Sequence, residues 1–144
     1  MSGLSNYAAN QILECYVRRS ARISVRAALY LSIHTGNPGA DGTANVTTYP
    51  GYARVRVDNV TNFFAGTAVV QSDATGRKVI NGASVQFPTV AGTGFTATHV
   101  GLWDASTSGN FLMAIDLSAS LVYAVGDIPV VSASNLTVIA KTQI

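Results

Sequence analysis

Two histidines and two aspartates are the residues of this sequence whose chemistry could support catalysis or metal binding. His34 and His99 lie in different predicted strands, and neither has a carboxylate or a second histidine at metal-ligand spacing. Asp104 and Asp116 could face each other across a hairpin, as the paired carboxylates of glycosidases do, but such a site needs a cleft lined with aromatic residues. With one tryptophan in 144 residues, the sequence does not favour that chemistry. We expect His34 on the polar face of its strand and His99 in a hairpin or an interface.

A glycine-rich segment, Gly92–Ala97, matches a relaxed phosphate-binding pattern, but such a loop must open a helix to hold an anion. The residues that follow Gly94 favour a strand instead. The sequence also lacks the G-x-S-x-G turn that carries a nucleophilic serine. We therefore predict no catalytic residue, no metal and no cofactor, and we do not expect an enzyme.

The arginines are better suited to recognition. Along residues 52–58, Tyr, Arg and Asp side chains alternate with Ala and Val side chains, so Tyr52, Arg54 and Arg56 are expected on one strand face. A guanidinium group binds a carboxylate through two parallel hydrogen bonds, which would make these arginines anchors at an interface. The net charge is +2 without a dense lysine cluster, which does not favour nucleic acid as the partner.

The element that could present an interface is an amino-terminal helix. Residues 5–19 contain no Gly or Pro, and Ser5 or Asn6 can act as the N-cap. Apolar residues recur along one helical face, and Ile12, Leu13 and Tyr16 are among them. This stripe predicts docking either on the chain's own domain or on a neighbouring subunit.

The rest of the chain predicts strands, at about 27–34, 52–58, 67–71, 78–80, 83–87, 97–104, 110–117 and 128–140. The segment Asp104–Asn110 is a hairpin loop, and Trp103 and Phe111 flank it closely enough to stack, which predicts a buried Trp103. Part of the run 128–140 is apolar on both faces, which predicts a central strand with Pro129 at its start or at a bulge.

These patterns predict a mainly β fold, an antiparallel β-sandwich or jelly-roll-like domain with one short amino-terminal amphipathic helix. We expect a single domain over 1–144, with a helical arm at 1–20 and a β-domain at 21–144. Charged residues make up 11% of the chain, against about 25% in an average soluble protein. So few charges suggest that other subunits cover much of the surface, and we predict a homo-oligomer, with a trimer as the expected state.

Several segments resemble small structural proteins of tailed-bacteriophage virions, a family often labelled tail fibre or tail proteins. They occur in the order that this family shows: Ser5–Leu13, Leu29–Gly39 (LYLSIHTGNPG), Pro50–Arg54 (PGYAR), Thr98–Ala105 (THVGLWDA), Ser108–Leu112 (SGNFL), Val125–Pro129 and Ser134–Val138. The resemblance covers nearly the whole chain, and its motifs are structural rather than catalytic.

The resemblance implies a non-enzymatic virion component that is made in the host cytoplasm and then assembled. Some similar proteins decorate capsids, and the chain has neither a heptad shaft nor a repeat, which favours a capsid decoration (cement) protein that clamps major capsid subunits. The alternatives are a small tail, baseplate or fibre-root protein and, more distantly, a carbohydrate-binding module. The candidate interface residues are Ile12, Leu13, Tyr16, Tyr52, Arg54, Arg56 and Trp103. No membrane contact is expected.

Overall fold

A computed structural model of the chain describes residues 3–19, 27–59, 63–64, 69–70 and 76–141. Its elements, in chain order, are β1 (Gly3–Leu4), α1 (Asn6–Ile12), the π-helical turn η1 (Leu13–Val17), β2 (Tyr30–His34), β3 (Val55–Arg56), β4 (Val69–Val70), β5 (Gly76–Ile80), β6 (Val85–Gln86), β7 (Phe95–Trp103), β8 (Phe111–Tyr123), β9 (Val130–Val131) and β10 (Thr137–Lys141).

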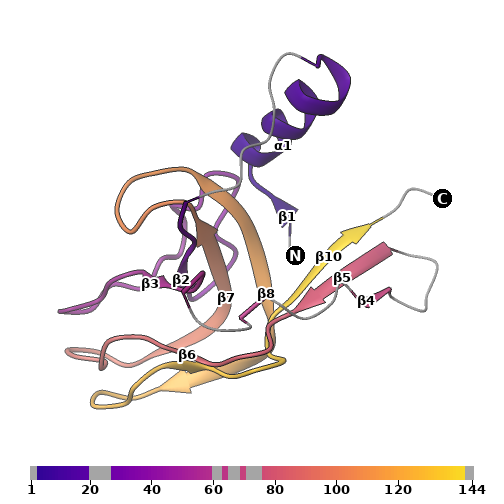
Figure 1. The fold of residues 1–144 in the computed structure, drawn as a ribbon. Coiled ribbons are helices and arrows are strands. Elements are labelled where there is room, and N and C mark those ends of the chain that lie inside the picture. The colour runs from indigo at the N-terminus through magenta and orange to yellow at the C-terminus, as the bar shows by residue number, and fades with distance from the viewer. Residues whose placement is uncertain (1–2, 20–26, 60–62, 65–68, 71–75, 142–144) are drawn as a thin grey trace.

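The described strands pair in an antiparallel manner throughout, in three sheets. The largest has the order β1-β8-β7-β2-β3, and two smaller sheets have the orders β10-β5-β4 and β6-β9 (Figure 1). The predicted fold class, mainly antiparallel β with one short amino-terminal helix, is confirmed.

The β7–β8 hairpin forms the middle of the large sheet and closes where the sequence predicted. Val100 pairs with Ile115, and Trp103 pairs with Phe111. The Asp104 carboxylate accepts hydrogen bonds from the backbone N–H of Asn110 at 2.7 Å and from its side-chain amide at 2.8 Å. This local turn chemistry fixes the loop. Both strands are longer than predicted, and β8 continues to Tyr123.

The main core lies on one face of the large sheet. Leu31, Ile33, Val100 and Ile115 are at most 1% exposed there, and residues of the smaller sheets pack over them. The opposite face is also covered, so the half-buried pattern predicted for 27–34 is wrong. Leu31, Ser32, Ile33 and His34 are all buried, because the segment 36–47 packs over the polar face.

Two further predictions of strand extent need correction. Residues 52–58 form only the two-residue β3, and the predicted central strand 128–140 is divided into β9 and β10. Of the strand predicted at 67–71, residues 69 and 70 form β4 and the others lie outside the described residues.

The break between β9 and β10 is held by one buried side chain, Asn81, which is 0% exposed. Its amide nitrogen donates to the carbonyl oxygens of Ala83 at 2.9 Å and Ser132 at 2.8 Å. Its amide oxygen accepts from the backbone N–H of Leu136 at 2.8 Å. Three segments are thus joined by one amide, which turns the chain away from a continuous strand.

Replacing Asn81 with aspartate tests this junction. Asn81→Asp keeps the shape and the acceptor oxygen, but it places a carboxylate oxygen against two buried carbonyls that then lack a donor. Each unsatisfied buried group costs about 1–3 kcal/mol, so we expect the free energy of unfolding in urea to fall by about 2–5 kcal/mol. The matched control is Asn135→Asp, because Asn135 Oδ1 accepts a hydrogen bond from the Ser118 hydroxyl and a carboxylate can do the same. Equal losses in the two variants would contradict this role for Asn81.

Candidate interaction surface

The amino-terminal helix begins where the sequence predicted. The Ser5 hydroxyl oxygen accepts a hydrogen bond from the backbone N–H of Ala8 at 3.0 Å, which is N-cap geometry. The helix changes to the π-helical turn η1 at Leu13 and ends at Val17. Glu14 and Arg18 form an i,i+4 ion pair with an N–O distance of 2.5 Å. We call residues Asn6–Val17 the helical arm.

The base of the helical arm is fixed to the start of β8. Ser5 is 1% exposed, and its hydroxyl donates to the carbonyl oxygen of Phe111. Its backbone N–H donates to Leu112 O at 2.9 Å, and the backbone N–H of Asn6 donates to Ala40 O at 3.2 Å. Strand β1 extends this attachment by pairing with residues 113–114 of β8. The direction of the arm is therefore set by the β-domain.

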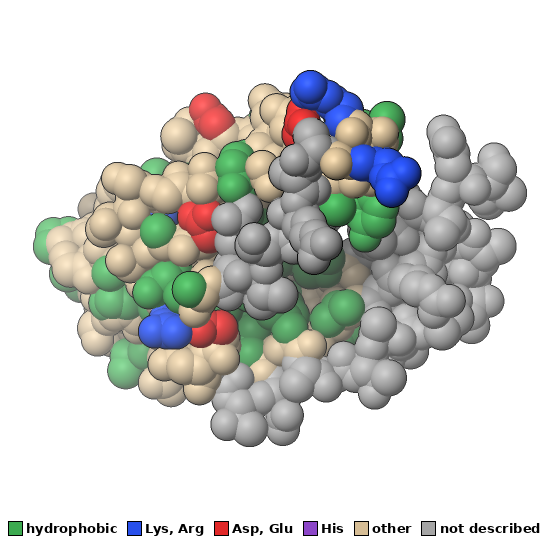
Figure 2. Space-filling model, turned by 45° about the horizontal axis from the view of Figure 1, so that its top comes forward, with side chains coloured by type: hydrophobic (Ala, Val, Ile, Leu, Met, Phe, Trp, Pro, Cys, Tyr) green, Lys and Arg blue, Asp and Glu red, His purple; other side chains and the backbone are tan. Residues whose placement is uncertain are grey.

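Beyond its base, the arm leaves the sheets and its apolar stripe is open. Ile12, Leu13, Tyr16 and Val17 are 37%, 53%, 74% and 71% exposed, and neither α1 nor η1 contains a buried residue. Figure 1 shows the arm projecting from the large sheet. Figure 2 shows hydrophobic side chains next to basic ones at the upper right, on a surface with few charges elsewhere. Within the described part of the chain, the domain does not cover this stripe, so docking on the chain's own domain, one alternative from the sequence, is not seen there.

Trp103 lies in a second cluster, on the face of the large sheet opposite the main core. It is 6% exposed, which confirms the predicted burial. Its ring centroid is 4.9 Å from that of Phe111 with the ring planes tilted by 52°, so the two rings are in contact but are not stacked face to face. Gly42 approaches both rings with φ +77°, and a Cβ there would lie 2.6 Å from Trp103. Only glycine fits this approach without displacement.

A chain of buried polar groups runs beneath this cluster. Trp103 Nε1–H donates to Ser32 Oγ at 2.8 Å, and Ser32 Oγ lies 2.7 Å from His34 Nε2. His34 Nδ1 lies 2.9 Å from the carbonyl oxygen of Ala44, which can only accept. The proton must therefore sit on Nδ1, and Nε2 accepts from the serine hydroxyl. Both ring nitrogens are occupied, so His34 is a structural side chain rather than a ligand or a base.

The strand order brings together two histidines that lie far apart in the sequence. His34 and His99 are direct partners across β2 and β7, and His99 is opposite Asp116 on β8. His99 Nε2 lies 2.9 Å from Asp116 Oδ1, and Nδ1 lies 2.8 Å from Thr98 Oγ1. Asp116 thus faces His99 and does not pair with Asp104 as considered from the sequence. The described residues contain no group of three metal-ligating side chains, and burial lowers the pKa of both histidines.

Arg54, predicted to anchor a partner, is engaged within the chain. Its guanidinium carbon lies 3.4 Å from the centroid of the Trp103 ring, and Nη1 donates to Ala105 O at 3.1 Å and Ser108 O at 2.8 Å. Arg54 therefore covers Trp103 and braces the β7–β8 loop. Its neighbour Tyr52 packs on the main core, and the Tyr52 hydroxyl accepts from Ile33 N–H at 3.0 Å. These contacts correct the outward placement expected for this ring, and its burial raises the pKa of Tyr52 to about 12.

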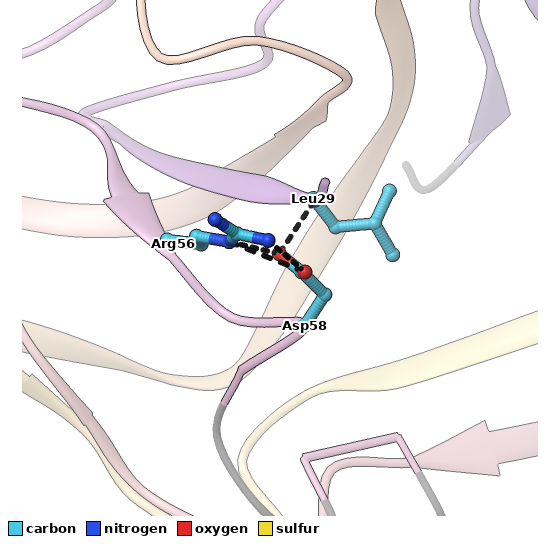
Figure 3. A network of polar contacts seen from close by, with 3 residues as sticks. All are labelled: Leu29, Arg56 and Asp58. Carbon is cyan, nitrogen blue, oxygen red and sulfur yellow. Dashed lines mark hydrogen bonds and ion pairs between the residues drawn. The ribbon is translucent and has the colours of Figure 1, made fainter. Parts of the chain in front are cut away.

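Arg56 is more exposed but is also paired. Its Nε and Nη2 donate to the two oxygens of Asp58 at 2.9 and 2.7 Å (Figure 3). Asp58 Oδ1 also accepts from the backbone N–H of Leu29 at 2.8 Å, so the pair ties the approach to β2 to the end of β3. The hydrogen bonds from Arg56 and Leu29 lower the pKa of Asp58 to about 2. A role for Arg56 in binding a partner stays a prediction.

Of the seven predicted interface residues, three lie together on an open surface: Ile12, Leu13 and Tyr16. Arg54 and Trp103 contact each other, but inside the domain. The sequence-based choice of interface residues missed Val122, Val125 and Ile128, which are 77%, 58% and 52% exposed at the far end of β8. The available signal was the presence of three large apolar residues around the Gly126-Asp127 turn. No described helix has the length and apolar character to cross a bilayer.

The polar side chains described above serve packing within the β-domain, and the apolar stripe of the helical arm is open among the described residues. A family model described as "Podophage GP4 fiber I protein gp80" matches residues 3–139. The chain belongs to this family, and the resemblance to phage virion structural proteins of the tail-fibre type is confirmed. No curated protein matches the sequence.

The buried, neutral His34 makes stability depend on pH. Burial lowers its pKa in the folded state below the ordinary value of 6.5, with the neighbouring His99 and Arg54 acting in the same direction. The unfolded chain then binds the proton more readily, so stability is full above about pH 6.5 and declines as the pH falls below it. We expect a decline of at most about 1.36 kcal/mol per pH unit for this one proton, measured by urea unfolding between mildly alkaline and mildly acidic pH.

The matched variants are His34→Gln and His99→Gln. His34→Gln removes the titrating ring, so it should flatten the pH dependence even though it also lowers stability at alkaline pH. His99→Gln should retain more of the dependence than His34→Gln. Burial also lowers the pKa of His99, but Asp116 opposes that shift, and the side chain of His99 is 15% exposed whereas His34 is 0% exposed. An unchanged slope in His34→Gln would show that this histidine does not titrate in the way described.

Proposed function

We propose that this protein is a structural subunit of a phage fibre and that it joins the virion by burying the apolar stripe of its helical arm against another subunit. The observation that carries the proposal is the open stripe on a rigidly based arm, in a chain of a fibre protein family. The protein acts by association and needs no chemical step.

The energetics of the arm support docking. An isolated helix shorter than about 12–15 residues is marginal in water, and the arm spans Asn6–Val17 without burying a residue on its own domain. Fully burying one large apolar side chain contributes about 1.5–3 kcal/mol. Covering Ile12, Leu13, Tyr16 and Val17 together would therefore stabilise both the helix and the contact.

The family description favours the fibre alternative over capsid decoration, which was the main expectation from the sequence. A fibre subunit would contact tail, baseplate or fibre proteins rather than the major capsid protein. The carbohydrate-binding alternative depended on an exposed aromatic platform. Trp103 is 6% exposed and lies beneath Arg54, so it does not offer that platform.

Replacing the stripe while keeping the base of the arm tests the proposal. In the variant Leu13→Ser, Tyr16→Ser, Val17→Ser, the hydrogen bonds of Ser5 remain, and all three changed side chains are more than half exposed. We expect normal folding but a fall of more than about tenfold in copies per purified virion, which corresponds to about 1.4 kcal/mol of lost binding. Quantitative mass spectrometry of virions from a complemented deletion phage measures this number.

The control variant is Asn10→Ser, Gln11→Ser, which changes polar residues of the same arm and should incorporate normally. For the wild-type protein, a copy number of a few rings supports a fibre, whereas hundreds of copies would place the protein on the capsid. Absence of the wild-type protein from purified virions would contradict the proposed function.

A further inference from the structure

The structure has a second open apolar surface, far from the helical arm. Val122, at the end of β8, is 77% exposed, and Val125 and Ile128 in the turn to β9 are 58% and 52% exposed. We call these three residues the turn patch. The turn itself is held firmly, because the Asp127 carboxylate accepts from Ala124 N–H at 2.8 Å and Gly126 N–H donates to Val90 O at 2.9 Å. The patch is therefore a fixed surface on the β-domain.

Strand β8 separates the two surfaces. The helical arm is attached to the first residues of β8, through the carbonyl groups of Phe111 and Leu112, and the turn patch begins near the other end of the strand, at Val122. Fully extended, the strand from Phe111 to Val122 would span at most about 36 Å at about 3.3 Å per residue. Figure 1 shows the arm and the end of β8 at opposite ends of the molecule. The two surfaces thus cannot cover each other within one copy.

The charges at the two ends are opposite in sign. Arg18 and Arg19 directly follow the arm, and the one acidic residue of the arm, Glu14, already pairs with Arg18. Residues 118–130, all of which the structure describes, contain Asp127 and no Lys or Arg. Asp127 is exposed beside the turn patch. Attraction between these ends would guide an arm toward a turn patch and would oppose pairing of two arms.

We propose that the helical arm of one copy packs against the turn patch of the next copy, so that the partner of both surfaces is this same chain. The inference rests on the proposed function in one respect, the use of the arm as the assembling element, and it adds the identity of the partner. A single kind of contact covers both open surfaces, whereas arm-to-arm pairing would leave every turn patch exposed.

A contact between two different surfaces is heterologous. It closes into a ring when the rotation between successive copies allows and otherwise continues as a filament. The trimer expected from the sequence is then a ring of three copies joined arm to turn. Repetition of the contact along an axis would instead give an elongated stack.

Mixing two complementary variants tests the pairing directly. An arm variant, Tyr16→Glu with Val17→Glu, destroys one surface, and a turn variant, Val122→Glu with Val125→Glu, destroys the other. All four side chains are more than half exposed, so both variants should keep the wild-type circular dichroism. Thr107→Glu, in the exposed β7–β8 loop, is the control for added charge.

Sedimentation velocity over a concentration series gives the readout. We expect the wild type and Thr107→Glu to assemble, each of the two surface variants to be monomeric alone, and their equimolar mixture to form a heterodimer. In that heterodimer the intact arm of the turn variant binds the intact turn patch of the arm variant.

Assembly of the turn variant by itself would overturn the inference, because it would show that arms pair with arms. A mixture that remains monomeric would also overturn it. A wild-type protein that stays monomeric but enters virions would assign the arm to a different virion protein, which contradicts the inference and leaves the proposed function standing. Heterodimer formation by a protein that is absent from virions would contradict the proposed function alone.

Discussion

The buried chain of hydrogen bonds from Trp103 through Ser32 and His34 to Ala44 O is the interaction on which the rest of the structure depends. It satisfies polar groups on the second face of the central sheet, so that Ser32 and His34 can be fully buried there. The segment that contributes Ala44 also provides Ala40 O, which accepts from the base of the helical arm. The same aromatic cluster includes Phe111, whose carbonyl oxygen accepts from Ser5. The direction of the arm is therefore a consequence of how this face is closed.

Local chemistry explains what could be predicted from the sequence. The Ser5 N-cap and the Asp104–Asn110 loop depend on residues a few positions apart, and both form as predicted. The segments that could not be predicted depend on distant partners. The break in 128–140 is held by Asn81, some fifty residues earlier, and the burial of His34 depends on a covering segment that no alternation pattern encodes. The stacking of Arg54 on Trp103 also joins residues far apart in the sequence.

The interface residues predicted from the sequence divide in the same way, into those that depend on local patterns and those that depend on distant partners. The helical stripe with Ile12, Leu13 and Tyr16 could be predicted, because a periodic apolar face is a local property of the sequence. The stripe is open because the described part of the domain does not cover it. Alternation correctly placed Arg56 in a strand, but it did not show that Tyr52 lies outside that strand with its ring against the core, or that Asp58 binds Arg56. Position within a virion is not encoded in any residue type, and the choice of a fibre over a capsid comes from the family alone.

The central claim is that the helical arm is an unpartnered element held ready for a contact, and amide hydrogen exchange tests it most directly. In dilute monomer the amides of Asn6–Val17 should exchange quickly, because a short helix without buried residues opens readily, while those of β2, β7 and β8 exchange slowly. In the assembled form the same arm amides should become strongly protected. Arm amides that are equally slow in the dilute monomer and in the assembly would contradict the account, because they would show that the arm is already stabilised within a single copy.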